Sequence, residues 1–188
     1  MKIVKIQVLR GPNIWSIRRK KLIQMRLDLE EVEHLPTNKI EGFRENLEKL
    51  IPSLITHRCS EGVEGGFFQR VEMGTWMGHV IEHIALEIQT LAGMDAGFGR
   101  TRETKTPGVY NVVFSYIEEN SGIYAAEQSV EIAQALMEGR DYPIQECIQT
   151  LKEKRERERL GPSTGRIVEE AAARNIRWIR LRRNYLIQ

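Results

Sequence analysis

Cysteine is scarce in this chain of 188 residues, which contains only Cys59 and Cys147. Two cysteines are too few for a disulfide framework, so we expect a reducing, cytoplasmic environment. The sequence also lacks an apolar run long enough to span a bilayer, and it lacks a secretory signal with a basic head and a small-residue cleavage site. These absences argue against a disulfide-rich secreted protein and against a membrane partner.

Neither sign of charge dominates, since 28 Lys and Arg stand against 26 Asp and Glu, and 41% of the residues are hydrophobic. This composition is ordinary for a globular domain, and the length allows one well-buried core. Residues 151–188 are basic and residues 1–150 mildly acidic, an asymmetry that sometimes accompanies nucleic-acid binding. The alternating charges of LKEKRERERL (151–160) favour a solvated helix instead, so we predict no nucleic-acid partner.

Hydrophobic periodicity predicts an α+β fold, in which a mixed sheet of about four strands packs against three or four helices. Alternation and β-branched residues predict the strands 3–9, 22–29, 67–73 and 109–117. Helical spacing predicts the helices 43–57 (broken or kinked at Pro52), 75–91, 125–139 and 144–159. A boundary near Gly161 divides a domain of residues 1–160 from residues 161–188, which look like one helix followed by a strand.

Positive charge is missing from one long stretch, because no Lys or Arg occurs between Arg70 and Arg100. That stretch contains GHVIEHIALE (78–87), in which a helix would place four polar residues on one side and aliphatic residues on the other. The four polar residues are His79, Glu82, His83 and Glu87. Imidazoles one helical turn apart can bind the same metal ion. The alternative is an ordinary solvated helix face, although such a face normally carries Lys or Arg.

The order H-x-x-E-H matches the inverted zinc-peptidase motif, in which both histidines bind the metal and the glutamate activates water. A catalytic zinc needs a third protein ligand and an open fourth position. Cys59, in the glycine-rich loop HRCSEGVEGG (57–66), is the leading candidate for that ligand. Glu87 is an alternative ligand, or a hydrogen-bond partner that orients an imidazole.

Other candidate ligands are weaker. His57 precedes the same glycine-rich loop, and His34 lies further along the chain from the motif. Cys147 falls within a helical pattern, which predicts a core position.

Four long stretches of the sequence resemble one known family. They are VLRGPNIWSIRRKKLIQMRLDLEE (8–31), GHVIEHIALEIQTLAGMDAGFGRTRET (78–104), TPGVYNVV (106–113) and LGPSTGRIVEEAAARNI (160–176). In this order, and over essentially the whole chain, they closely resemble the amino-terminal part of the cyanophycin synthetases.

The resemblance implies a large cytoplasmic ligase of three domains that assembles into a homo-oligomer. A central ATP-grasp domain would extend a poly-aspartate backbone, and a carboxy-terminal domain similar to Mur ligases would join arginine to each side-chain carboxylate. Both reactions would use ATP and Mg²⁺ in those downstream domains and not in this chain. Residues 161–188 would then be the start of the ATP-grasp domain.

The resemblance also implies that the amino-terminal domain binds the cyanophycin polymer, and that in some members it is a zinc hydrolase that cuts the polymer internally to generate primers. Carried over to this sequence, Cys59, His79 and His83 would bind Zn²⁺ and Glu82 would be the catalytic base. The alternative is a non-catalytic module that tethers the polymer.

Two charged segments are candidates for polymer contacts. The glycine-bearing loop GFGRTRETK (97–105) offers Arg100, Arg102 and Glu103, which match the alternating carboxylate and guanidinium groups of cyanophycin. The basic cluster at residues 18–21 is the second candidate, although a charged turn before a strand explains it equally well.

Overall fold

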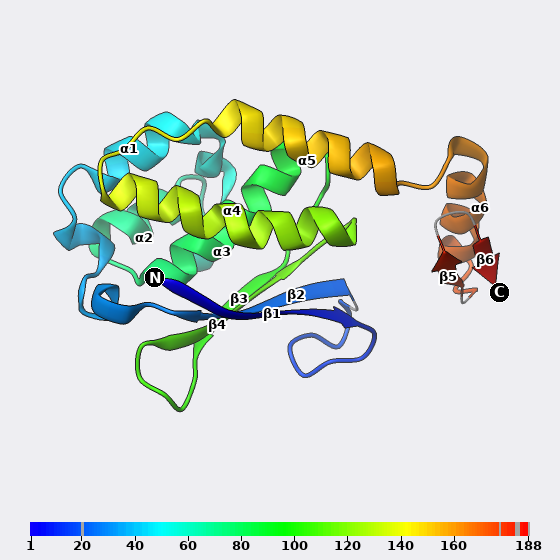
Figure 1. Cartoon of the computed structure of the whole chain (residues 1–188), viewed down its shortest axis with the longest axis horizontal. Helices are drawn as coiled ribbons and strands as arrows, with labels where there is room; N and C mark the ends of the chain where they lie inside the picture. The colour runs from blue at the N-terminus through cyan, green and yellow to red at the C-terminus, as the bar shows by residue number, and fades with distance from the viewer. Residues whose placement is uncertain (20, 177, 183–184, 188) are drawn as a thin grey trace.

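The computed structural model of the chain describes residues 1–19, 21–176, 178–182 and 185–187. Its main sheet has four strands in the order β1-β2-β4-β3, and helices α1 to α5 lie on one face of that sheet (Figure 1). The strands are β1 (Lys2–Arg10), β2 (Lys21–Asp28), β3 (Gly99–Glu103) and β4 (Val109–Ser115). The predicted α+β class is therefore confirmed.

The sheet is antiparallel throughout, so the prediction of a mixed sheet was wrong. Short loops join β1 to β2 and β3 to β4, and a short connection permits only antiparallel pairing of the strands it joins. The segment that leads from β2 back to β4 contains helices, yet it too returns the chain in the opposite direction.

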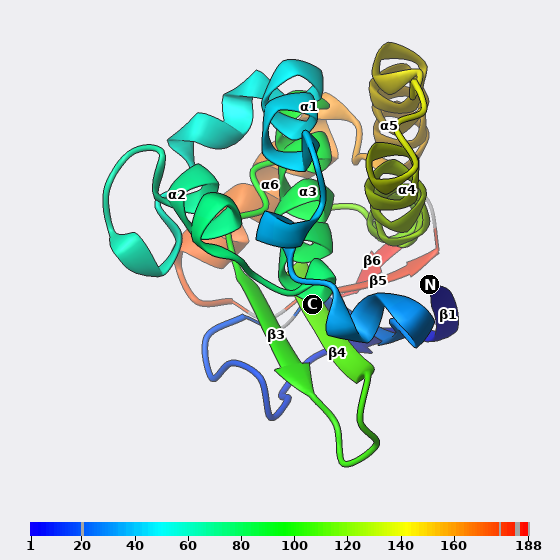
Figure 2. The same cartoon turned by 90° about the vertical axis from the view of Figure 1, so that its left-hand side faces the viewer.

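The α-helices are α1 (Phe43–Leu50), α2 (Gly66–Met73), α3 (Met77–Leu91), α4 (Glu119–Met137), α5 (Ile144–Glu158) and α6 (Pro162–Ala173). Short 3₁₀ helices are η1 (Glu30–His34), η2 (Thr37–Lys39), η3 (Pro52–Thr56) and η4 (Cys59–Glu61). A second, two-stranded sheet pairs β5 (Ile179–Arg182) with β6 (Tyr185–Ile187). Figure 2 shows α3 between the α1–α2 side of the helical layer and the α4–α5 side. No helix in the described ranges is long and apolar enough to cross a membrane.

The core forms where α3 packs on the sheet. The inward residues of β4 are Tyr110, Val112 and Phe114, and those of β2 are Ile23, Met25 and Leu27, all of which are buried. Alternation in the sequence predicted β2, and β-branched and aromatic residues predicted β4. Gly78 allows α3 to approach β3 and β4 closely, since a Cβ at this position would meet Thr101 and Tyr110.

Two segments differ from the sequence predictions. Residues 67–73 form helix α2 and not a strand, and the buried residues Phe67, Phe68 and Val71 follow helical spacing. A run this short and apolar does not distinguish the two structures by periodicity. Residues 99–103 form strand β3, whereas the sequence predicted a loop there. The expected break at Pro52 is confirmed, because α1 ends at Leu50 and Pro52 begins η3.

Helix α3 is buried on nearly all sides, so it does not present a solvated polar face. Glu82 is 6% exposed and His83 is 8% exposed, and Glu87 is also buried. The alternative of an ordinary solvated face is therefore wrong for these residues. Cys147 is buried in α5, as predicted.

Candidate metal centre

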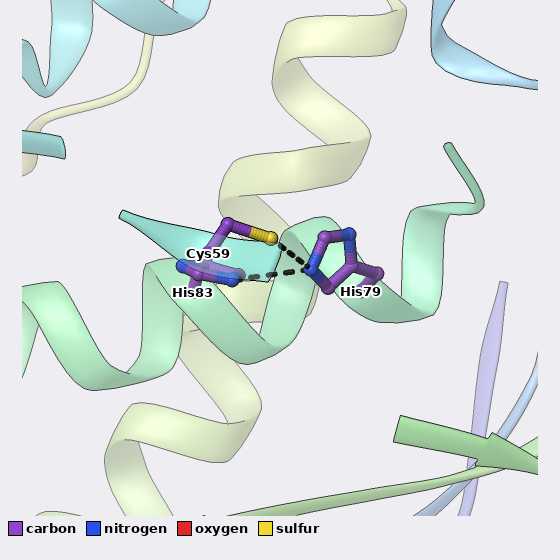
Figure 3. Close-up of side chains that lie close together, drawn as sticks. All are labelled: Cys59, His79 and His83. Atoms are coloured by element: carbon purple, nitrogen blue, oxygen red, sulfur yellow. Dashed lines mark hydrogen bonds between the residues drawn. The ribbon is translucent and has the colours of Figure 1, made fainter. Parts of the chain in front are cut away.

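Three side chains from two separate elements converge beside the N-terminal half of α3 (Figure 3). Cys59 comes from η4, and His79 and His83 come from successive turns of α3. The Nε2 atom of His79 lies 3.3 Å from the Sγ atom of Cys59 and 3.1 Å from the Nε2 atom of His83. All three donor atoms lie within 4.8 Å of one another. Zinc bonds of about 2.0–2.3 Å place tetrahedral ligands at comparable separations, so the three residues fit a metal ion.

Cys59 reaches this position through an unusual backbone conformation. Its φ angle is +50°, in the left-handed region that residues other than glycine seldom adopt. Gly62 and Gly65 also have positive φ angles, and a Cβ at Gly66 would collide with the backbone of Arg58. The glycines therefore allow the loop to fold back against α2. Backbone strain of this kind tends to occur at functional sites.

The remaining ring nitrogen of each histidine is held by a hydrogen bond. The Nδ1 atom of His79 lies 3.0 Å from the hydroxyl of Thr75. The Nδ1 atom of His83 lies 2.8 Å from Nδ1 of His57, whose Nε2 atom lies 2.7 Å from a carboxylate oxygen of Glu87. If protons are assigned so that His79 donates to Thr75, His83 donates to His57 and His57 donates to Glu87, the Nε2 lone pairs of His79 and His83 are both free for a metal.

The environment keeps both histidines uncharged. Burial, with the nearby Arg70 adding a smaller effect, lowers the pKa of His79 to about 4. Burial also lowers the pKa of His83 well below its usual value, and His79 and His57 add to the effect. The ring of Phe67 stacks on His83 with centroids 4.2 Å apart. Neutral imidazoles are the form that binds metal ions.

Glu82 lies beside this group on α3 and has a strongly altered acidity. Burial raises the pKa of its carboxyl to about 7, although the hydrogen bond from Thr101 and the charge of Arg100 oppose the shift. The hydroxyl of Thr101 donates to Oε2 of Glu82 over 2.6 Å. A carboxyl with a pKa near neutrality can both accept and release a proton at pH 7.

These residues line an open cleft of about 990 Å³. Four arginines also line it, Arg58 and Arg70 on the side of η4 and α2, and Arg100 and Arg102 on β3. Among the residues that the structure describes, none of the four forms a salt bridge. The cleft thus joins a candidate metal centre to unpaired positive charge, which suits a substrate that carries carboxylates.

The other predicted site residues are not among the three clustered ligands, although Glu87 lines the same cleft. Glu103 follows the part of β3 that lines the cleft, and its carboxylate accepts a hydrogen bond from the backbone N–H of Gly108. Glu87 contacts His57 and is not one of the three clustered ligands. His34 is exposed in η1 and does not line the cleft.

The second basic cluster is also absent from the cleft. Arg18, Arg19 and Lys21 are not among the residues that line it, and Lys20 lies outside the described residues.

Sequence reasoning missed four residues of the centre or assigned them another role. His57 was considered only as a weak ligand, and Thr75, Thr101 and Phe67 were not considered. Thr75 stands four residues before His79, a spacing that the sequence displays. The other three come from elements that only the tertiary fold brings to α3.

Gly99 is required for the position of Glu82, since a Cβ at this residue would overlap the carboxylate. We expect Gly99→Ala to displace Glu82 and to reduce any activity that depends on it by about 10- to 100-fold. Metal content and thermal unfolding should stay close to those of the parent. Gly97→Ala is the matched control, because Gly97 lines the same cleft and a Cβ there would meet open space. Equal activity of the two variants would contradict the expectation.

Comparison with known proteins assigns the family. The family model described as the cyanophycin synthase-like N-terminal domain matches residues 24–138. The chain belongs to this family. The matched segment includes Cys59, His79, Glu82 and His83, together with Arg100 and Arg102.

Curated relatives of this domain are similar over the whole chain. A cyanophycin synthetase of Geminocystis herdmanii is 54% identical, and one of Synechocystis sp. is 52% identical. A third, of Trichormus variabilis, is 53% identical. The chain spans about 22% of the length of the first two relatives and 21% of the third. The resemblance seen in the sequence is therefore confirmed, and the domain corresponds to roughly one fifth of such a protein.

Proposed function

We propose that this domain is a zinc-dependent endo-hydrolase of cyanophycin that also binds the polymer. The observation that carries the proposal is the convergence of Cys59, His79 and His83 beside Glu82 in an open cleft. The relatives are named cyanophycin synthetases, which supports the polymer as the substrate.

Each residue of the centre has a distinct part in this proposal. Cys59, His79 and His83 would hold Zn²⁺ and leave its fourth position open. When bound, the ion would supply a polarised carbonyl and an activated water at neutral pH, which hydrolysis of an unstrained amide requires. Glu82 would take a proton from the attacking water and return it to the leaving amine, and Thr101 would orient its carboxylate.

Charged residues would hold the substrate in the cleft. Arg100 and Arg102 would pair with carboxylates of cyanophycin, and Arg58 and Arg70 would do so on the opposite wall. Asp95 also lines the cleft and would face a guanidinium group. Glu103 would meet the polymer only where it continues past the end of β3.

Within a full-length protein, the domain would supply primers to the ligase domains. We propose that an ATP-grasp domain, beginning within residues 161–188, and a Mur ligase-like domain follow in a cytoplasmic homo-oligomer. ATP and Mg²⁺ would act in those domains. Internal cuts would increase the number of chain ends on which they work.

Removal of the metal tests the proposal directly. The purified domain should contain about one zinc per chain and should release short oligomers from cyanophycin. Chelation should abolish the release, and added zinc should restore it. The measurements are metal analysis by mass spectrometry and chromatography of the products. If the zinc-loaded domain releases no oligomers, the hydrolase proposal fails.

A non-catalytic tethering module is the second candidate, and the four unpaired arginines favour it because they do not depend on a metal. In that case cyanophycin binding survives chelation while no cleavage occurs at any zinc concentration. A pull-down on cyanophycin granules, with and without chelator, distinguishes the two functions.

A further inference from the structure

We infer that the backbone of the polymer binds along the free edge of β3 as an additional strand, and so carries one of its amides to the metal centre. This inference rests on the proposed function, for which it supplies the mode of substrate binding. It follows from the position of β3, the direction of its backbone groups and its contact with Glu82.

Strand β3 is at one edge of the sheet, and among the residues that the structure describes it pairs with β4 alone. Two backbone hydrogen bonds show which residues of this segment turn their N–H and C=O groups toward β4. Ser115 N–H donates to the carbonyl of Phe98, and Thr104 N–H donates to the carbonyl of Val109, both over 2.8 Å. The register between the strands is unbroken. In an antiparallel ladder only alternate residues exchange these bonds, so the even-numbered residues of β3 bond to β4. The N–H and C=O groups of Gly99, Thr101 and Glu103 therefore point away from the sheet.

This free edge borders the cleft that contains the candidate ligands. Residues 99–102 all line that cleft, together with Cys59, His79 and His83. The side chain of Thr101 fixes the position of this edge relative to Glu82, because its hydroxyl lies 2.6 Å from Oε2 of Glu82 and 3.2 Å from the carbonyl oxygen of Gly78. A chain paired with β3 would therefore pass beside the Glu82 carboxyl.

A poly-aspartate backbone suits this mode of binding. An α-linked chain can extend as a strand, and main-chain hydrogen bonds at a sheet edge give affinity without reading side chains. Every residue of the polymer carries the same arginyl branch, so a shift along the edge presents an equivalent chain to the centre. Alternate branches would project toward Arg100 and Arg102. Because any stretch of the polymer could bind in this way, this mode of binding would allow cuts within the chain.

The edge also needs protection from pairing with other proteins. Exposed Arg100 and Arg102 supply charge of the kind that discourages edge-to-edge association between copies. The same arginines would accept a chain that carries carboxylates. The two arginines would therefore discourage pairing of β3 with another copy of the protein and still allow pairing with the polymer.

Two variants at Thr101 isolate the backbone donor. Thr101→Ala loses the hydroxyl and keeps the outward N–H, whereas Thr101→Pro loses both, and proline is tolerated on an edge strand where the N–H is not used by the sheet. The probe is a synthetic multi-arginyl oligo-aspartate, and binding is measured by calorimetry in the Glu82→Gln background to prevent turnover. We expect Thr101→Pro to bind about tenfold more weakly than Thr101→Ala. Equal affinities, with both variants retaining zinc and native circular dichroism, would overturn the inference.

N-methylated probes test the pattern independently of any variant. Because the polymer repeats, a probe methylated at every second amide can shift by one residue and present its unmodified amides to β3. It should bind like the unmodified probe, whereas a probe methylated at every amide should bind at least about tenfold more weakly. If full methylation has no effect, the backbone does not pair with β3, whether or not the domain cleaves. If the oligomer binds with this pattern and is never cleaved, only the hydrolase proposal fails.

Discussion

Replacing Glu82 with glutamine should lower the rate of cyanophycin cleavage by about 10²- to 10⁴-fold, the range for loss of a general acid or base. The carboxamide has the size of the carboxylate, and its oxygen can still accept the hydrogen bond from Thr101. It cannot take a proton from water. We therefore expect zinc content, polymer binding and thermal unfolding to match those of the parent domain. Initial rates of oligomer release at saturating zinc are the measurement.

An exposed carboxylate on the same side of the molecule provides the control. Glu61 lies in η4, two residues after Cys59, and does not line the cleft. Glu61→Gln makes the same chemical change and should leave the rate within about twofold of the parent. Parental cleavage by Glu82→Gln would exclude Glu82 as the group that accepts the proton.

The helical part of the centre was predictable because its geometry is local. An angle of 100° per residue places His79 and His83 on the same side of any α-helix, whatever surrounds it. The glycines near Cys59 also indicated that its loop could fold back. The contacts of His57 with His83 and of Thr101 with Glu82 span 26 and 19 residues, and they depend on how η3 and β3 dock against α3. No periodicity in the sequence encodes such docking.

Burial of α3 alone explains why positive charge is missing around it. In the sequence, the absence of Lys and Arg from residues 71–99 counted against an ordinary solvated helix face. Most of α3 is buried, however, and a buried helix excludes unpaired cationic side chains whether or not it binds a metal. The stronger indication of a functional site is the set of buried polar side chains. Glu82, His83 and Glu87 are all buried on one helix, and all have hydrogen-bond partners from other elements. Buried ionisable groups arranged in this way are characteristic of functional sites.

Loss of the acceptor on His57 should weaken zinc binding by about 10- to 100-fold, the usual effect of removing a hydrogen-bond partner of a metal ligand. The His83 ring presents Nε2 to the metal only while Nδ1 carries the proton, and Nδ1 of His57, 2.8 Å away, is the atom placed to accept a hydrogen bond from it. His57→Asn places a carboxamide oxygen where Nδ1 lies and should keep zinc affinity within about threefold. His57→Gln places its carboxamide nearer the position of Nε2 and should show the full loss. Competition with a chromophoric chelator measures both affinities.

The contrast between asparagine and glutamine separates orientation of His83 from simple packing. Both side chains are smaller than imidazole and both leave space beside Phe67, so a packing role would weaken both variants alike. His34→Gln, at an exposed position in η1, controls for loss of an imidazole as such. If both His57 variants bind zinc as tightly as the parent, stacking on Phe67 and the rigidity of α3 suffice to hold the ring. If Asn retains affinity and Gln loses it, the chain from Glu87 through His57 sets the tautomer of His83. A metal centre built in this way depends on η3 as well as α3, which explains why the helix motif alone does not define it.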